Sequence, residues 1–128
     1  DRLMLAHAMK RGVGGFVLDG AVRDVEAFSD VNLPVFAAGV SHRGPYKDGP
    51  GEINVSVAID GMVIKPGDLV IGDWDGVLSI PLEDVESILK KTNEKQAAEA
   101  VDMEKIEAGE WDRSWVDKTL KDRGCIMP

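Results

Sequence analysis

A series of short apolar runs, each bounded by glycine, proline or Asp-Gly, occupies the chain up to Ile80 and limits the possible folds more than any other feature. Apolar runs of four to eight residues between such turn residues are typical of buried strands. The first of them is entered through Gly14 and Gly15. The runs that predict strands are 14–18, 34–40, 53–59, 62–64, 69–72 and 77–80.

Turn residues and helix signals order these strands. Asp60-Gly61 predicts a tight hairpin between two of the runs, and residues 73–76 predict a second hairpin. Pro81 suits the first position of a helix, and helical sequence then continues to about residue 108. The predicted helices are 3–11, 23–30, 81–108 and 111–120. This order predicts a mixed α/β fold with antiparallel strands in the middle of the chain.

Composition excludes several functional classes. The 128 residues are enough for one independent core, and the formal net charge of -8 argues against a nucleic-acid partner. Cys125 is the single cysteine, so neither an intrachain disulfide nor a zinc site built from cysteines is possible. No apolar run has the length of a membrane span, so we expect no membrane partner. Together these features predict a cytoplasmic protein.

The segment 19–24 (DGAVRD) is the strongest candidate for chemistry. We expect Asp19 and Gly20 to end the first strand and Arg23-Asp24 to open the next helix. Ligands of α/β sheets gather at the carboxyl ends of strands, where helix N-termini favour anions. Arg23 could bind a carboxylate or keto oxygen with its planar guanidinium, and Asp24 could bind a hard cation. The alternative is a surface ion pair in which Asp24 only favours the helix start.

A glycine-rich loop at 41–51 provides a second candidate. It contains His42, Arg43 and Lys47, and Glu52 and Asn54 border it. Loops on a rigid scaffold often contribute binding groups, so this loop could contact the distal carboxylate of a substrate. A solvated loop without a binding role is the alternative.

Three other features have simpler explanations. His7 lies inside a predicted helix, where a packed or surface histidine is more common than a catalytic one. Asp73 and Asp75 have the spacing of metal ligands, but Asp-x-Asp-Gly between apolar runs is mainly turn chemistry. Trp111 and Trp115 are one helical turn apart, which predicts a packed core or interface.

Several separated segments resemble one family in order. Residues 11–24 (RGVGGFVLDGAVRD) are similar to the signature stretch of the RraA-like family. Residues 33–40 (LPVFAAGV), the run 51–81 and the following helix match as well, so the resemblance covers most of positions 3–90. The family includes 4-hydroxy-4-methyl-2-oxoglutarate aldolases, other class II pyruvate aldolases and regulators of ribonuclease activity.

The resemblance implies a swivelling β/β/α fold. Residues 1–81 would form the RraA-like core, without the upstream part of the family domain, and residues 82–128 would form a helical extension packed on it. The resemblance also implies assembly into trimers or hexamers, with the active site at a subunit interface.

Residue by residue, the resemblance assigns a site. Arg23 would hold the keto oxygen of a 2-oxo acid and stabilise its enolate, and Asp24 would anchor Mg²⁺ or Mn²⁺. The backbone N–H groups of Leu3 and Met4 would contact the substrate carboxylate.

At one position this chain departs from the family pattern. The family usually has an acid before the Arg-Asp pair at the position that Arg2 occupies here, and Asp1 lies one residue earlier. Either Asp1 takes the role of that acid as a metal ligand, or the site has lost it.

These inferences predict a divalent-metal-dependent lyase acting on a 2-oxo acid. The reaction would be retro-aldol cleavage of a 4-hydroxy-2-oxo acid or decarboxylation of oxaloacetate, through pyruvate enolate. The alternative is a non-catalytic, protein-binding regulator of the ribonuclease-inhibitor type, whose acidic surface would engage a basic segment of a partner. Metal-dependent turnover of oxaloacetate separates the two.

Overall fold

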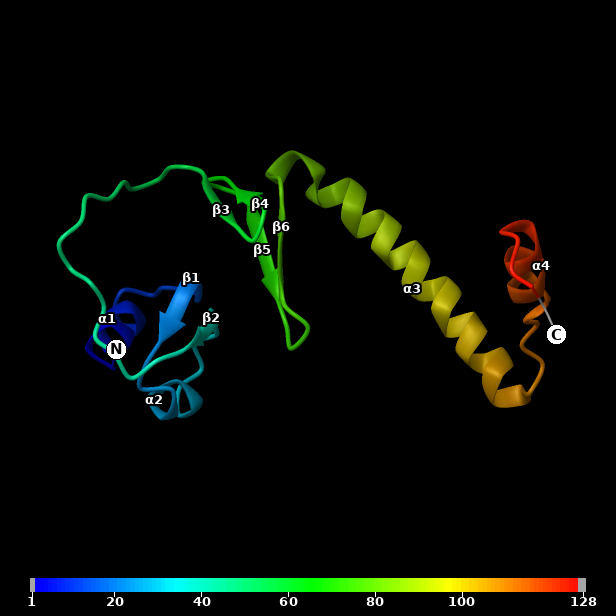
Figure 1. The fold of residues 1–128 in the computed structure, drawn as a ribbon, viewed down its shortest axis with the longest axis horizontal. Coiled ribbons are helices and arrows are strands. Elements are labelled where there is room, and N and C mark those ends of the chain that lie inside the picture. The colour runs from blue at the N-terminus through cyan, green and yellow to red at the C-terminus, as the bar shows by residue number, and fades with distance from the viewer. Residues whose placement is uncertain (1, 127–128) are drawn as a thin grey trace. The chain divides into compact units, whose positions relative to one another are not determined.

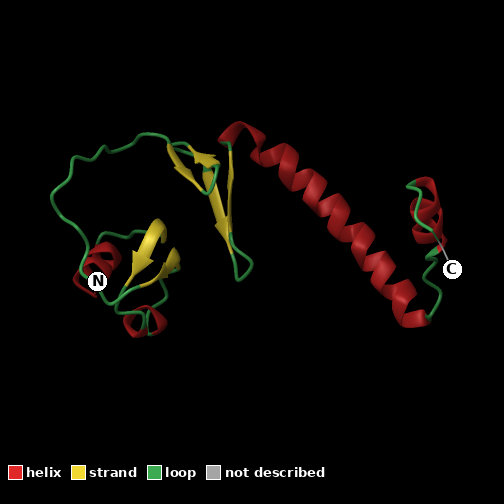
Figure 2. Cartoon of the chain, in the orientation of Figure 1, coloured by secondary structure: helices red, strands yellow, loops and turns green. Residues whose placement is uncertain are grey.

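The computed structural model describes residues 2–126, and the chain divides into two compact units, Asp1–Val85 and Glu86–Pro128. The first unit contains both helices and strands, and its last four strands follow one another without a helix, whereas helices make up the second unit (Figures 1 and 2). The mixed α/β class predicted from the sequence is confirmed. The elements of the first unit are α1 (Arg2–Lys10), β1 (Phe16–Val22), α2 (Glu26–Ser29), β2 (Val35–Val40), β3 (Val57–Ile59), β4 (Met62–Ile64), β5 (Leu69–Gly72), β6 (Val77–Ile80) and the 3₁₀ helix η1 (Leu82–Asp84).

A parallel strand pair, β1 and β2, connected through α2, is the centre of the first unit. The prediction that Asp19 and Gly20 end the first strand was wrong, because β1 continues to Val22. The pairing moves from Leu18 opposite Ala37 to Ala21 opposite Gly39, so β1 has one more residue than β2 over this stretch. Asp19 and Gly20 thus form an irregularity of the bulge type inside the strand.

The buried core of the first unit lies between the two short helices and the strands. Leu5 and Ala8 of α1 and Leu33 are its buried members. Phe16 and Phe28 are among the half-buried apolar side chains that pack against them. This cluster packs α1 against Phe16 at the beginning of β1 and against Phe28 of α2, and both phenylalanines also line the pocket described below.

Residues on the opposite face of the strand pair contact the hairpins. Val17 pairs with Phe36 in register, and strand alternation directs both away from the face of Phe16. A Cβ added to Gly72 of β5 would lie 2.6 Å from the Phe36 ring, so glycine is required for this close approach. The strand pair therefore has α1 and α2 on one face and β5 on the other.

Two antiparallel hairpins, β3–β4 and β5–β6, confirm the predicted turns. Asp60 and Gly61 have φ angles of 47° and 81°, as a tight hairpin turn requires. The strand predicted at 53–59 is shorter, since only Val57–Ile59 pairs. Asn54 has a φ of 57°, and this left-handed conformation interrupts the extended backbone upstream of β3.

The second unit consists of α3 (Val85–Ala108, which begins at the last residue of the first unit) and α4 (Ser114–Asp122). Pro81 has a ψ of 137°, so it precedes η1 in an extended conformation and the prediction that it starts the helix was wrong. The end of α3 near residue 108 is confirmed. The helix predicted from Trp111 begins at Ser114, after Asp112 accepts a hydrogen bond from the Ser114 N–H at 2.8 Å. Among residues 2–126, no helix is long and apolar enough to cross a membrane.

Candidate functional site

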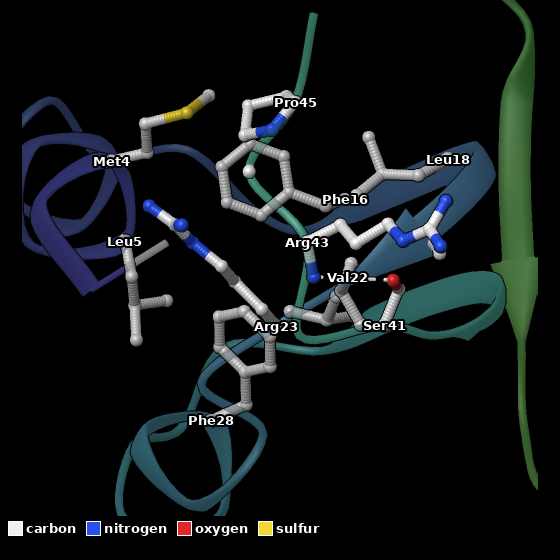
Figure 3. Close-up of a pocket in the computed structure, with 13 residues that line it drawn as sticks. Met4, Leu5, Phe16, Leu18, Val22, Arg23, Phe28, Ser41, Arg43 and Pro45 are labelled. Carbon is white, nitrogen blue, oxygen red and sulfur yellow. Dashed lines mark hydrogen bonds between the residues drawn. The ribbon is translucent and has the colours of Figure 1, made fainter.

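A pocket of about 400 Å³ lies at the carboxyl end of β1, between α1 and the loop that follows β2. Its size is within the usual range of small-molecule sites. Figure 3 shows its walls, which are mostly apolar. The lining residues are Met4, Leu5, Phe16, Leu18, Ala21, Val22, Arg23, Phe28, Val35, Ser41, Arg43, Gly44 and Pro45.

Arg23 directly follows the last residue of β1 and forms one wall of this pocket. Its side chain is 37% exposed, and its guanidinium points toward Met4 and Leu5 of α1 (Figure 3). On the other side, a Cβ added to Gly44 would lie 3.7 Å from Arg23 Nη1. Arg23 is therefore held between α1 and the loop after β2, with its charge facing a partly apolar space.

Asp24 occupies a different position from the one predicted. Its φ is 60°, so it lies outside α2, which begins at Glu26, and it does not open that helix. Its Oδ2 accepts a hydrogen bond from the Arg2 N–H at 3.3 Å and lies 3.9 Å from Arg23 Nε. Asp24 thus caps the start of α1, and the ion pair with Arg23 that the sequence analysis gave as the alternative is present.

Arg23 and Asp24 line different hollows, although their charged groups are only 3.9 Å apart. Arg23 faces the pocket, whereas Asp24 lines an adjacent hollow together with Arg2, Glu26 and Asp30. A non-glycine residue with the φ of Asp24 is strained, and such strain is often found at functional sites.

A metal would have few protein ligands here. In the described part of the chain, no three His, Cys, Asp or Glu side chains form a group that could hold a metal ion. Asp1, the second predicted ligand, lies outside the described residues. Asp24 has a 47% exposed carboxylate, and Mg²⁺ commonly binds through one or two carboxylates and several waters. One described carboxylate is thus compatible with a loosely held Mg²⁺ or Mn²⁺, but it does not form a metal site by itself.

The two residues predicted to bind substrate through their backbones are placed differently. Met4 lines the pocket beside Arg23, whereas Leu3 is 80% exposed and is not among the lining residues. Of the basic loop, Arg43 lines the pocket, and His42 and Lys47 do not. Sequence reasoning missed Ser41, although a polar residue directly after a strand is a usual signal for a ligand site.

The remaining candidates lie away from the pocket. His7 is exposed on α1, and Glu52 and Asn54 are exposed in the segment before β3. Asp73 accepts a hydrogen bond from the Asp75 N–H at 2.8 Å, which is turn chemistry. Trp111 and Trp115 are 37% and 58% exposed, so neither is packed in a core of the described residues, and their packing at an interface stays a prediction.

The chain resembles several known proteins. A protein of Halalkalibacterium halodurans, provisionally named 4-hydroxy-4-methyl-2-oxoglutarate aldolase, is 44% identical over 94 residues, which cover 73% of this chain and 45% of that protein. A Thermus thermophilus protein named 4-hydroxy-4-methyl-2-oxoglutarate aldolase is 34% identical over 74 residues, covering 58% and 45%. The chain spans about half the length of these relatives.

The chain is also similar to a solved structure. The crystal structure of an uncharacterized protein from Pseudomonas syringae pv. tomato matches with a TM-score of 0.72 and 27% identity, covering 84% of this chain and 54% of that one. The family model described as RraA-like, Aldolase/RraA, matches residues 1–79. The RraA-like fold class inferred from the sequence is confirmed, and the chain belongs to the RraA-like family.

Proposed function

We propose that this chain is a divalent-metal-dependent lyase acting on a 2-oxo acid. The observation behind the proposal is Arg23, a guanidinium at the carboxyl end of β1 that faces a pocket of small-molecule size. The aldolase names of the relatives supply the reaction class. The reactions are retro-aldol cleavage of a 4-hydroxy-2-oxo acid and decarboxylation of oxaloacetate.

Both reactions leave the same charge to stabilise. In the retro-aldol reaction the C3–C4 bond breaks, its electron pair remains with C3 as pyruvate enolate, and the 4-hydroxyl loses its proton as C4 becomes a carbonyl. In oxaloacetate the bond to the departing CO₂ breaks and the same enolate remains. A proton added at C3 completes either reaction and yields pyruvate.

Arg23 is the residue we assign to that developing charge. Its planar guanidinium can donate two hydrogen bonds to the oxygen at C2 and the neighbouring carboxylate. Donors fixed in a partly apolar site stabilise an oxyanion more strongly than water does. The guanidinium lies between α1 and the loop at Gly44, where it can reach a substrate in the pocket.

Asp24 is the residue we assign to Mg²⁺ or Mn²⁺, with Asp1 as a second ligand. When bound, the metal would act as a Lewis acid that polarises the keto group. Asp24 also bonds the first N–H of α1, so this carboxylate would connect the metal to the helix that contributes Met4 to the pocket. The backbone N–H groups of Leu3 and Met4 remain our proposed contacts for the substrate carboxylate.

We also propose that the protein works in the cytoplasm as a homotrimer or hexamer, without nucleic-acid or membrane partners. Light scattering at micromolar concentration tests the assembly, and a purely monomeric protein would count against it.

A coupled assay for pyruvate tests the activity. Oxaloacetate and a 4-hydroxy-2-oxo acid should give pyruvate with Mg²⁺ or Mn²⁺, and EDTA should stop the reaction. Loss of turnover in Asp1→Ala as well as Asp24→Ala would assign the second ligand to Asp1.

A non-catalytic, protein-binding regulator of the ribonuclease-inhibitor type is the second candidate. The lack of a three-ligand metal group among residues 2–126 favours it. Absence of metal-stimulated pyruvate release from the full chain would support the regulator and remove the lyase.

A further inference from the structure

Arg43 differs from the other basic residues of its loop. Arg43 lines the pocket at the end of β1, whereas the neighbouring His42 and Lys47 do not. Its side chain is exposed, and no carboxylate among residues 2–126 forms an ion pair with it. A second arginine therefore lines the pocket that Arg23 lines, without a described protein anion to neutralise it.

Hydrogen bonds hold the backbone of this arginine at the site. The Ser41 N–H donates to the carbonyl oxygen of Val22 at 2.9 Å, which ties the loop to the last residue of β1. The Arg43 N–H then donates to Ser41 Oγ at 3.2 Å. Since Arg23 follows Val22, the two arginines are fixed to the same strand end through a short chain of contacts.

The two guanidinium groups point in opposite directions. In Figure 3 that of Arg23 is directed toward Met4 on α1 and that of Arg43 toward Leu18 on β1, with the Phe16 ring between them in this view. Among the described residues that line the pocket there is no aspartate or glutamate. Its lining thus combines two cationic ends with an apolar middle.

We propose that Arg43 is a specificity-determining residue that binds a second carboxylate, at the end of the substrate opposite the 2-oxo group held by Arg23. This inference rests on the proposed function for the orientation of the substrate. A guanidinium binds a carboxylate through two charge-assisted hydrogen bonds, which are stronger than neutral ones. A monoacid would leave Arg43 without an anionic partner, so the site discriminates in favour of an extended diacid.

Equilibrium binding tests this proposal without turnover. The probes are 2-oxoglutarate and 2-oxopentanoate, which share a five-carbon chain and differ in the distal carboxylate. Calorimetry on the full chain with Mg²⁺ should show tighter binding of the diacid. Arg43→Met should weaken 2-oxoglutarate by about 10- to 100-fold and change 2-oxopentanoate by less than about twofold.

Two further variants sharpen the test. Arg43→Lys keeps the charge but loses the two-point geometry, so its loss for the diacid should be intermediate. Lys47→Met removes one positive charge from the same loop outside the pocket, and both affinities should stay as in the wild type. Circular dichroism should show unchanged folding, because the Arg43 side chain is exposed.

Each result has a defined meaning. Equal weakening of both acids by Arg43→Met, no preference in the wild type, no binding of either acid, or the same diacid-specific loss in Lys47→Met would overturn the role of Arg43. Diacid-selective binding that depends on Arg43, without release of pyruvate from any substrate, would support this role and remove the lyase. Turnover whose selectivity does not depend on Arg43 would support the lyase and overturn the role of Arg43.

Discussion

Residues 2–40 and residues 86–126 are stabilised in different ways. In the first region Leu5, Ala8 and Leu33 are buried together, and helices and strands contact one another across the sequence. In the second region no described residue of α3 or α4 is buried. The ion pairs of α3 join near neighbours, such as Lys95 and Glu99 at 3.4 Å, and each such pair stabilises a helix by only about 0.2–0.5 kcal/mol.

This difference in contacts shows which region of the chain can form a functional site. The hydrogen bond from Arg2 to Asp24 spans 22 positions, and the loop bond from Ser41 to Val22 spans almost as many. Such long-range contacts fix functional groups from separate segments at one point. Local contacts along a single helix stabilise that helix but bring no distant groups together, so we expect the sensitive substitutions in the first region.

The largest effect should come from Arg23→Lys. Lysine keeps the charge but loses the planar pair of donors, so kcat/KM for pyruvate release should fall by about 10²- to 10³-fold. The matched control in the second region is Arg113→Lys, which should leave kcat/KM unchanged. Near-wild-type activity in Arg23→Lys, or a comparable loss in Arg113→Lys, would remove the distinction between the regions.

Asp24 permits a test that separates its two contacts. Asp24→Asn keeps an oxygen for the Arg2 N–H and tolerates the positive φ, but it loses the charge. Asp24→Ala loses the oxygen acceptor, the tolerance of a positive φ and the charge. Both variants should lose at least about tenfold in metal-dependent turnover, because Asp24 is the proposed ligand and even the loss of a group that only orients a metal ligand costs about 10- to 100-fold.

Stability should distinguish the same two variants. Asp24→Ala should lower the free energy of unfolding by about 1–2 kcal/mol, from the lost cap and the strained backbone, and Asp24→Asn should change it little. Thermal denaturation measures this difference. Full Mg²⁺-stimulated activity in Asp24→Asn would show that the carboxylate only caps α1.

Core substitutions compare the two regions without reference to activity. Leu5 is 4% exposed, and Leu5→Ala should cost about 2 kcal/mol of unfolding free energy, at the lower end for a buried leucine because the cluster is small. Leu89 on α3 is 57% exposed, and Leu89→Ala should cost less than about 0.5 kcal/mol. Equal losses in urea titrations would mean that α3 is packed in solution and that the contrast does not hold.

The sequence was sufficient where structure depends on neighbouring residues. Asp60-Gly61 predicted its hairpin, because few other residue pairs adopt two successive positive φ angles. The long helix ended near the predicted residue 108. The family signature also drew attention to Arg23, which the structure places on a pocket.

The sequence was insufficient where distant residues decide the outcome. Asp24 carries an ordinary helix-start signal, yet its carboxylate caps α1 instead, a contact that only the folded chain creates. The bulge at Asp19 and Gly20 depends on the register with β2, so the apparent strand end was misplaced. Arg43 could be proposed from its basic loop, but Lys47 could not be separated from it without the pocket.

The smallest predicted effect belongs to Asp112, in the second region. Hydrogen bonds from the Ser114 N–H and then from the Ser114 hydroxyl lower the pKa of the Asp112 carboxyl below its ordinary value. Because the folded pKa is depressed, this contribution to α4 is present above the unfolded pKa of about 3.9 and is lost as pH falls through the folded pKa. The Ser114 amide shift in an NMR titration should therefore follow a midpoint below that of an ordinary aspartate.

The control variant is Asp112→Asn, which keeps the hydrogen-bond acceptor but has no carboxyl to titrate. Its Ser114 amide should lack this midpoint, while Arg23-dependent activity stays unchanged. An ordinary midpoint at Ser114 would mean that the bond at the start of α4 does not persist in solution, and it would leave the contrast between the two regions even larger.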